Sequence, residues 1–436
     1  MTEPGSRHRG GEENVENETP SALWSYPLGL FGGLGLELEY MIVDRDSLDV
    51  RPIADEVLKS VTGAYTSDAE PEGPPPDGIV GWSNELALHV IELKTMAPVA
   101  TPDGLAARFQ RHIAQINDIL APMKARLLPG AMHPWMDPDR ELKLWPHELN
   151  PVYETFNRIF SCRGHGWANL QSAHLNLPFA NDEEFGRLHA AIRAVLPLIP
   201  ALAASSPVAD GRVTGMADYR VEVYRNNSRR VPLMAAGVIP EPVFTRTDYE
   251  REILGALFAQ LAPFDPEGIL RHEWANARGA TARFERGAIE IRLVDIQECP
   301  AADVAIAELL IATIRALAEE RWVPLADLER LEVEPLHETL LACIRDGENA
   351  LITHEPLCAA LGAGARVRAG DLWATLAGVL LPADTPSWAP LRTIFTRGTL
   401  ATRLVSALGE APDRAALHRE YTRLADSLRE GTMFVA

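Results

Sequence analysis

The sequence contains little lysine and little cysteine. Only four of the 436 residues are lysine, so arginine carries nearly all of the positive charge. Chemistry that depends on a lysine, such as a Schiff base or a P-loop, therefore has few candidate residues, whereas phosphates or carboxylates bound by arginine stay open. The cysteines show neither CxxC nor zinc-ribbon spacing and are predicted to be reduced, buried thiols of a cytosolic protein: Cys162, Cys299, Cys343 and Cys358.

The sequence also contains fewer basic than acidic residues. The chain has 41 Lys and Arg against 61 Asp and Glu, which gives a net charge of −20. This charge would repel nucleic acids and anionic membranes, so neither is expected as a partner, but it allows a small anionic ligand in a locally basic pocket. Residues 1–20 lack the apolar segment of a signal or transit peptide, and the longest weakly charged stretch, 194–209, is interrupted by prolines. We therefore expect a cytoplasmic protein that acts on small molecules.

Hydrophobic periodicity indicates an α+β fold. Alternating apolar residues predict strands, and amphipathic or strongly apolar runs predict helices. The strands do not alternate with helices in a regular βαβ order, so the sheet is expected to be antiparallel. The predicted strands cover 34–43, 84–95, 171–177, 220–224 and 288–296, the predicted helices cover 52–62, 104–127, a segment from 182, 301–322 and 414–429, and an exposed loop covers 66–78.

Two glutamates in the first predicted strand form a candidate site. Glu37 and Glu39 share one face of this strand, roughly 7 Å apart along the chain. Their neighbours on that face, Met41 and Val43, indicate that it is covered. Two buried carboxylates repel each other and favour protonation unless a cation compensates. The pair therefore predicts either a solvated edge strand or a site for a hard cation.

Three further segments contribute charged or ligating side chains. Glu85 and Glu92 are separated by an odd interval, which puts them on opposite faces of one straight strand, so both reach one site only if a bulge or turn lies between them. Glu290 and Arg292 share a face of a later strand, either as a structural ion pair or as residues of a cleft. His174 lies in an apolar strand, where it is either a core residue or a ligand of Mg²⁺ or Mn²⁺.

The common catalytic motifs are absent. Gly32, Gly33 and Gly35 precede a strand rather than a helix, and the sequence has no GxxxxGK[ST], HExxH or GxSxG. The remaining chemistry uses carboxylates, metal ions and arginines, a combination suited to a nucleoside triphosphate. A two-metal phosphoesterase would use Asp and His more than Glu, so phosphoryl transfer is favoured.

Five segments together resemble the glutamate–cysteine ligases, specifically the bacterial carboxylate–amine ligase type (family 2). They occur in the order found in that family, and the similarity spans about 30–320, roughly two-thirds of the chain. The segments are GLELEY (35–40), NELALHVIELKT (84–95), SAHLNL (172–177), ASSPVADGRVTGMADYR (204–220) and AIEIRLVDIQ (288–297).

The resemblance implies a glutamine-synthetase-like antiparallel sheet with helices packed on one face and with ATP and Mg²⁺ or Mn²⁺ on its concave face. It implies that Glu290 and Arg292 are catalytic, with Arg292 at the transferred phosphate. Arg220 would bind the carboxylate of glutamate, and Arg278 would contact a phosphate. Many relatives carry His-x-His where this chain has His174-Leu-Asn176. The implied metal ligands are Glu37, Glu39, Glu85, Glu92, His174 and Glu290.

The reaction implied by the resemblance is ATP-dependent formation of a γ-glutamyl amide. The γ-carboxylate of glutamate would attack the γ-phosphorus of ATP, and an amine, cysteine in the parent reaction, would then displace phosphate from the acyl phosphate. Three alternatives stay open: a different amine, a nucleotide sensor without catalysis, and a metallohydrolase that needs no ATP. A homodimer is only the common default. The implied organisation is a disordered tail at 1–22, an ATP- and metal-binding catalytic domain at 23–325, and a helical C-terminal subdomain of the same unit at 326–436.

Overall fold

One antiparallel sheet forms the centre of the protein. The computed structural model describes residues 25–71 and 79–436, so the predicted tail at 1–22 and part of the loop at 66–78 lie outside the described residues. The sheet confirms the predicted α+β class. One further strand, β5 (Ala125–Leu128), pairs with residues 41–44 at the end of β1 (Gly35–Asp44). The strand order is β2 (Asp68–Ala69), β3 (Val80–Asn84), β4 (Val90–Thr95), β1 (Gly35–Asp44), β6 (Ser172–Pro178), β10 (Ala288–Asp295) and β9 (Ala280–Arg283).

Long helices pack on one face of this sheet, as predicted. The side chains of β1 that point to this face, Leu36, Leu38, Tyr40 and Ile42, share one hydrophobic core with the helices. The helix predicted at 301–322 is α11, and it contacts both of the other long helices. The layer contains α1 (Ala54–Thr62), α2 (Leu105–Leu120), α6 (Asp182–Val195) and α11 (Pro300–Ala318).

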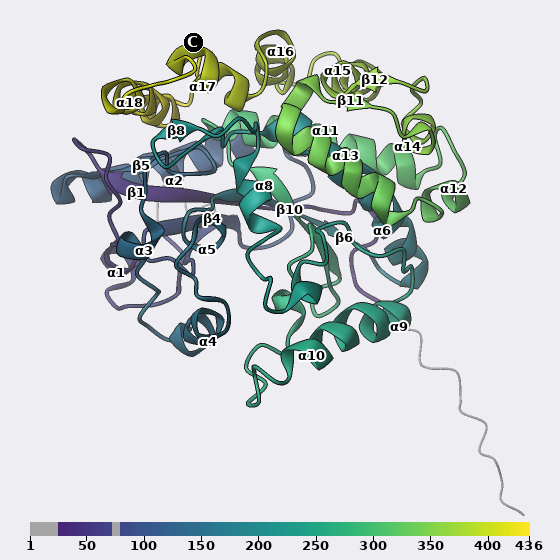
Figure 1. Ribbon diagram of the computed structural model, residues 1–436, viewed down its shortest axis with the longest axis horizontal. Helices are drawn as coiled ribbons and strands as arrows, with labels where there is room; N and C mark the ends of the chain where they lie inside the picture. The colour runs from purple at the N-terminus through teal and green to yellow at the C-terminus, as the bar shows by residue number, and fades with distance from the viewer. Residues whose placement is uncertain (1–24, 72–78) are drawn as a thin grey trace, which may run out of the picture.

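The C-terminal quarter is mainly helical, also as predicted. In Figure 1 its helices, green to yellow, form an arc along the top of the view. Buried side chains of this part, among them Leu336 and Trp373, belong to the same core as the sheet. The elements are α12 (Leu325–Glu329), α13 (Val333–Asp346), β11 (Leu351–Ile352), α14 (Glu355–Ala360), β12 (Val367–Arg368), α15 (Ala369–Leu380), α16 (Trp388–Arg397), α17 (Leu400–Leu408) and α18 (Arg414–Glu430).

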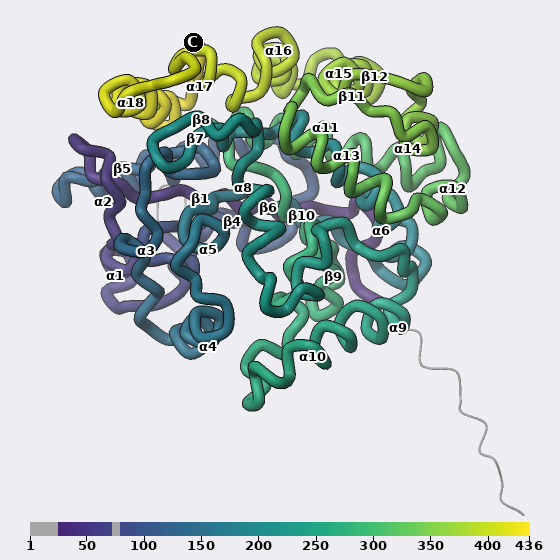
Figure 2. Tube along the Cα trace, in the orientation of Figure 1, coloured from purple at the N-terminus to yellow at the C-terminus, as the bar shows by residue number. Residues whose placement is uncertain are grey.

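Shorter elements lie on the other face and around the rim. Figure 2 shows α4 at the lower left and α10 to its right, both below the strands of the sheet in this view. A π-helical segment, Tyr249–Gly255, precedes α10. These elements are α3 (Pro138–Glu141), α4 (Asn150–Phe160), α5 (His165–Ala168), α7 (Pro200–Ala203), β7 (Val208–Ala209), β8 (Arg212–Val213), α8 (Tyr219–Tyr224), α9 (Arg246–Asp248) and α10 (Ala256–Leu261).

Two predicted elements are wrong. The segment at 220–224 is the helix α8 rather than a strand, because the Asp218 side chain caps its N-terminus by accepting a hydrogen bond from the Val221 N–H. The helix predicted to continue to residue 127 ends at Leu120, where a turn that contains Pro122 leads into β5. At 220–224 the alternation of apolar and polar residues favoured a strand. At 104–127 the helical spacing of apolar residues continued through the turn, so the helix was predicted too long.

The thiol prediction is confirmed for all four cysteines, which are free and buried. Among the helices of residues 25–71 and 79–436, none combines the length and the apolar character needed to cross a membrane.

A buried ion pair ties the segment after β10 to the C-terminal helices. Glu298 is fully buried, and its carboxylate lies 2.5 Å from Nη1 of Arg403, which has 2% of its side chain exposed. Arg403 also donates to the carbonyl of Phe434 near the C-terminus. Two compensating charges therefore lie inside the core where the two parts of the chain meet.

Replacing Glu298 by glutamine is expected to destabilise the protein by about 3 kcal/mol, because the charge of Arg403 would then lie buried beside a neutral amide. Urea unfolding followed by circular dichroism measures this change. Glu430→Gln, which removes an exposed carboxylate 3.0 Å from Arg429, is the control and should change stability by less than about 0.5 kcal/mol. Equal stability of the two variants would contradict a stabilising role of the buried Glu298–Arg403 ion pair.

Candidate active site

Strand register brings the predicted acidic residues to one face of the sheet. Glu37 of β1 lies directly opposite His174 of β6, and Glu39 of β1 lies opposite Glu92 of β4. Residues directly opposite each other in neighbouring antiparallel strands point to the same face. Glu290 of β10 joins them from the next strand beyond β6. Four strands therefore deliver the cluster to the face opposite the long helices.

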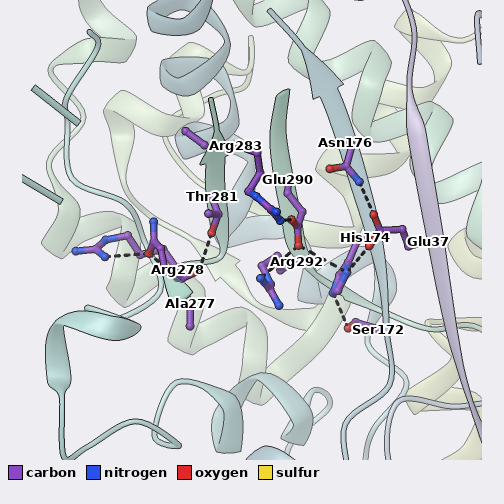
Figure 3. Close-up of polar contacts among 12 residues, drawn as sticks. Glu37, Ser172, His174, Asn176, Ala277, Arg278, Thr281, Arg283, Glu290 and Arg292 are labelled. Carbon is purple, nitrogen blue, oxygen red and sulfur yellow. Dashed lines mark hydrogen bonds and ion pairs between the residues drawn. The ribbon is translucent and has the colours of Figure 1, made fainter. Parts of the chain in front are cut away.

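His174 lies at the centre of this cluster (Figure 3). Its Nδ1 is 3.0 Å from Glu37 and 3.8 Å from Glu290, and its Nε2 is 3.7 Å from Glu39. Ligand atoms of Glu37, His174 and Glu290 lie within 4.8 Å of one another, and so do those of Glu39, Glu92 and His174. His174 thus faces carboxylates rather than an apolar core, and its imidazole joins two groups of possible ligands.

A turn resolves the spacing problem of Glu85 and Glu92. Glu85 follows the last residue of β3, whereas Glu92 lies within β4, and the two strands pair with each other. Their odd separation therefore spans a hairpin rather than one straight strand. Glu85 is near enough to the cluster to respond to its charges: burial first, and then the charge of Glu39, raise the pKa of Glu85 to about 7. The turn thus brings both side chains toward the same face.

The cluster carries more negative than positive charge. Burial, followed by the charges of Glu37 and Glu85, raises the pKa of Glu92 well above its ordinary value. Lys94 lies 3.8 Å from Glu92 but is shared with Asp68, which is 2.7 Å from the same amine. The carboxylates on this side of His174 are therefore undercompensated by the protein's own cations.

The other side of the cluster is bounded by arginines. Glu290 lies 2.8 Å from Nη1 of Arg283 and 3.3 Å from Nη1 of Arg292. Burial alone would raise the pKa of Glu290, but the charges of Arg292, His174 and Arg283 outweigh it and lower the pKa to about 2. Arg292 keeps 24% of its side chain exposed, although its Nε is buried and has no hydrogen-bond partner in the described part of the chain. Glu290 thus stays ionised beside a guanidinium that can accept a further partner.

The two other predicted arginines lie apart from the carboxylate cluster. Arg220 has 2% of its side chain exposed and forms an ion pair with fully buried Asp295. Arg278 has 1% exposed, and both its Nε and its Nη2 donate to the carboxylate of Glu241 at 2.6 Å. In Figure 3, Arg278 lies well away from His174 and Glu290. Each guanidinium is therefore already paired with a carboxylate from a distant part of the chain.

Four polar residues that the sequence did not single out also belong to the site. Asn176 occupies the position of the second histidine of the family's His-x-His pair and donates to Glu37 at 3.0 Å. Ser172 donates to Glu39 at 3.0 Å, and Ser83 donates to Glu92 at 2.6 Å. Arg283 pairs with Glu290 across a hairpin whose turn contains Gly287 at a φ of 66°. The two-residue spacing around His174 could have predicted Ser172 and Asn176, and the turn ahead of the last strand could have predicted Arg283.

Most of the chain matches a known protein family. The model of glutamate–cysteine ligase family 2 matches residues 33–376. The chain belongs to this family. The match continues beyond residue 320, so family 2 includes part of the helical region in which the sequence motifs gave no similarity. Membership makes the protein a ligase of the glutamate–cysteine ligase type.

Individual proteins are also similar to this chain. An uncharacterized protein of Archaeoglobus fulgidus is 34% identical over 318 residues, which cover 73% of this chain and 81% of that one. A Corynebacterium efficiens protein provisionally named glutamate–cysteine ligase 2-1 is 25% identical over 60% of this chain and 61% of its own length. A Salinispora tropica protein provisionally named glutamate–cysteine ligase 2 is 24% identical over 92% of this chain and 87% of its own.

Two solved structures share the fold of this family 2 member. A glutamate–cysteine ligase from Francisella tularensis, solved in complex with AMP, has a TM-score of 0.56 at 11% identity and covers 93% of this chain and 90% of its own. A bifunctional glutathione synthetase from Pasteurella multocida has a TM-score of 0.52 at 14% identity, over 90% of this chain and 52% of its own. At these identities the similarity establishes the fold, which is that of the glutamate–cysteine ligases.

Proposed function

We propose that the protein is an ATP-dependent carboxylate–amine ligase that joins the γ-carboxylate of glutamate to an amine, with cysteine as the acceptor. The observation that carries this proposal is the meeting, on one sheet face, of the carboxylate–histidine cluster with Arg292, which lies beside Glu290 and keeps 24% of its side chain exposed. Family membership supports the class of reaction. The AMP in the Francisella relative supports a nucleotide as one of the substrates.

The donor set fits a hard divalent cation. Carboxylate oxygens with one imidazole suit Mg²⁺ or Mn²⁺, and Mn²⁺ tolerates the nitrogen better. The raised pKa of Glu92 marks negative charge that the surrounding protein cations leave uncompensated. When bound, the cation would neutralise phosphate oxygens of ATP. The residues proposed to hold it are Glu37, Glu39, Glu85, Glu92, His174 and Glu290.

The protein's own groups would orient the phosphate. In the first step a γ-carboxylate oxygen of glutamate bonds to the γ-phosphorus while the bond from that phosphorus to ADP breaks. In the second step the amine nitrogen bonds to the acyl carbon, phosphate leaves, and the nitrogen loses a proton. Arg292, with 24% of its side chain exposed, would donate from its guanidinium to the transferred phosphoryl group, while Glu290 lies 3.3 Å from its Nη1 and fixes its position. Held in this way, Arg292 would meet developing charge without first reorganising.

Addition of Mg²⁺ or Mn²⁺ is expected to stabilise the protein by about 2–3 kcal/mol at a free concentration near 100 times Kd. Thermal unfolding after dialysis against EDTA, with and without added cation, measures this shift. Glu92→Gln should lose most of it, because one ligand is removed at a position 7% exposed. Asp68→Asn, which removes the exposed partner of Lys94, is the matched control and should keep the shift. Equal shifts in both variants would contradict the ligand assignment.

An amine panel tests the reaction itself. The purified protein is incubated with ATP, Mg²⁺, glutamate and one amine at a time, phosphate release is recorded, and mass spectrometry identifies the amide. Fastest phosphate release with cysteine, together with formation of γ-glutamylcysteine, supports the proposal. Faster phosphate release with another amine would change the proposed acceptor but not the proposed reaction. Binding of ATP without phosphate release under every condition would favour a nucleotide sensor. Substrate hydrolysis without any nucleotide would favour a metallohydrolase and contradict the proposal.

A further inference from the structure

A buried polar network lies directly behind Arg292. Its centre is Asp295, the last residue of β10, which is fully buried. The Asp295 carboxylate accepts hydrogen bonds from the N–H of Ser205 and the hydroxyl of Ser206, both at 2.8 Å, and from Nε of Arg220. The Ser206 hydroxyl in turn accepts from the N–H of Arg220 at 3.0 Å. Two of the sequence segments that carried the family resemblance, 204–220 and 288–297, therefore interlock here.

The network contacts an irregular stretch of β10 that contains Arg292. The pairing of β10 with β6 shifts register between Ile291 and Val294, so Arg292 lies in a β-bulge. Bulges redirect side chains and need support from outside the ladder. The Arg292 N–H donates to the carbonyl of Gly279 at 2.9 Å, and its carbonyl lies 3.5 Å from both terminal nitrogens of Arg220. The Arg220 guanidinium thus joins Asp295 to the backbone of the bulge.

Arg220 already has a carboxylate partner in this network, because it forms an ion pair with Asp295. Burial and the charge of Asp295 raise the pKa of nearby Asp218 well above its ordinary value. Nε of Arg220 donates to Asp295, and its two terminal nitrogens face the Arg292 carbonyl at 3.5 Å, so a substrate carboxylate would have to compete with these partners inside the core. With 2% of its side chain exposed, Arg220 also offers almost no surface to a ligand.

We propose that Arg220 and Asp295 are positioning residues that hold the bulge and aim Arg292 at the reacting phosphate, and that Arg220 is not the ligand of the glutamate carboxylate. This inference rests on the proposed function, in which Arg292 contacts the transferred phosphoryl group. It replaces the role that the family resemblance implied for Arg220. The Ser205 and Ser206 donors belong to the same support, because they fix the Asp295 carboxylate.

Steady-state kinetics separate the two roles. Asp295→Asn and Arg220→Lys are expected to lower kcat by roughly 10- to 100-fold and to leave the KM for glutamate within about twofold, because small misplacements of a catalytic group act on the transition state. Ser206→Ala, a milder change, should lower kcat in the same direction. When Arg292 is already replaced by lysine, Asp295→Asn should lower kcat by less than a further factor of about two, because its effect acts through Arg292.

Glu298→Gln is the matched control, because it also breaks a fully buried carboxylate–arginine pair after β10 but has no recorded contact with Arg292. It should lower stability and keep kcat. A large rise in the KM for glutamate with unchanged kcat in Arg220→Lys would overturn the proposal, and so would full additivity of Asp295→Asn with Arg292→Lys.

Hydrogen exchange tests the same inference without turnover. The Arg292 amide, bonded to Gly279, should exchange at least tenfold faster in Asp295→Asn than in wild type or in Glu298→Gln, each at the same free energy of unfolding adjusted with urea. Unchanged exchange in Asp295→Asn would overturn the positioning role. If the wild-type protein released no phosphate with any amine, the proposed function would fail. Faster exchange of the Arg292 amide in Asp295→Asn would still show that Asp295 stabilises the bulge.

Discussion

Glu290→Gln is expected to abolish ADP formation, lowering kcat by roughly 1,000-fold or more, while the chain stays folded. The carboxylate has three roles that an amide cannot fill, since it faces His174 as a possible metal ligand and pairs with both Arg283 and Arg292. Glutamine keeps the size of the side chain, and Arg283 keeps a second carboxylate, Glu285, at 2.5 Å. The loss should therefore appear in chemistry rather than in folding. A coupled assay of ADP measures it, with circular dichroism and thermal unfolding on the same preparation.

Glu285→Gln is the matched control for this variant. It removes the other carboxylate that contacts Arg283, but Glu285 has 46% of its side chain exposed and is not among the residues grouped around His174. Its kcat should stay within about twofold of wild type. If Glu290→Gln turned over ATP at the wild-type rate, the assignment of Glu290 to metal and phosphate binding would be wrong.

Periodicity predicted the strands of the site because their pattern is strictly local. In β1 the apolar residues alternate with Glu37 and Glu39, and this alternation alone fixes which side chains share a face. The strand of His174 and that of Glu290 were found for the same reason. Which residues then lie opposite each other depends on register, and register is set between segments far apart in the sequence. The pairing of Glu37 with His174 therefore became visible only in the folded chain.

Arginines show the same limit more strongly. In sequence, strand alternation placed Arg292 on one face with Glu290, whereas only the family resemblance singled out Arg220 and Arg278. The structure separates them by their partners: Asp295 pairs with Arg220, and Glu241 pairs with Arg278. Both partners lie far away along the chain, so no local pattern could reveal which guanidinium keeps a free nitrogen. Burial and pairing, rather than residue type, decide which arginine is available to a ligand.

This difference in availability leads to a second large expected effect. Arg292→Lys should lower kcat by about 100- to 1,000-fold, because an ammonium cannot reproduce the fork that contacts Glu290 and still points a donor at phosphate. The KM for glutamate should change little, since the contact is made to the transferred group. Phosphate release at saturating ATP, glutamate and amine measures the loss.

Arg278→Lys provides the comparison, because the same substitution is made at an arginine that the family resemblance also connected to phosphate. A lysine there can keep an ion pair with Glu241, and the cluster around His174 does not depend on it. We expect lower thermal stability, because the two-pronged contact with Glu241 is lost, but a kcat within about threefold of wild type. An equal loss of kcat in the two lysine variants would mean that Arg278 also contacts the reacting phosphate, and that its pairing with Glu241 is broken when substrates bind. A loss confined to Arg292→Lys would mean that, of these two arginines, only the one left free to donate acts on the phosphoryl group.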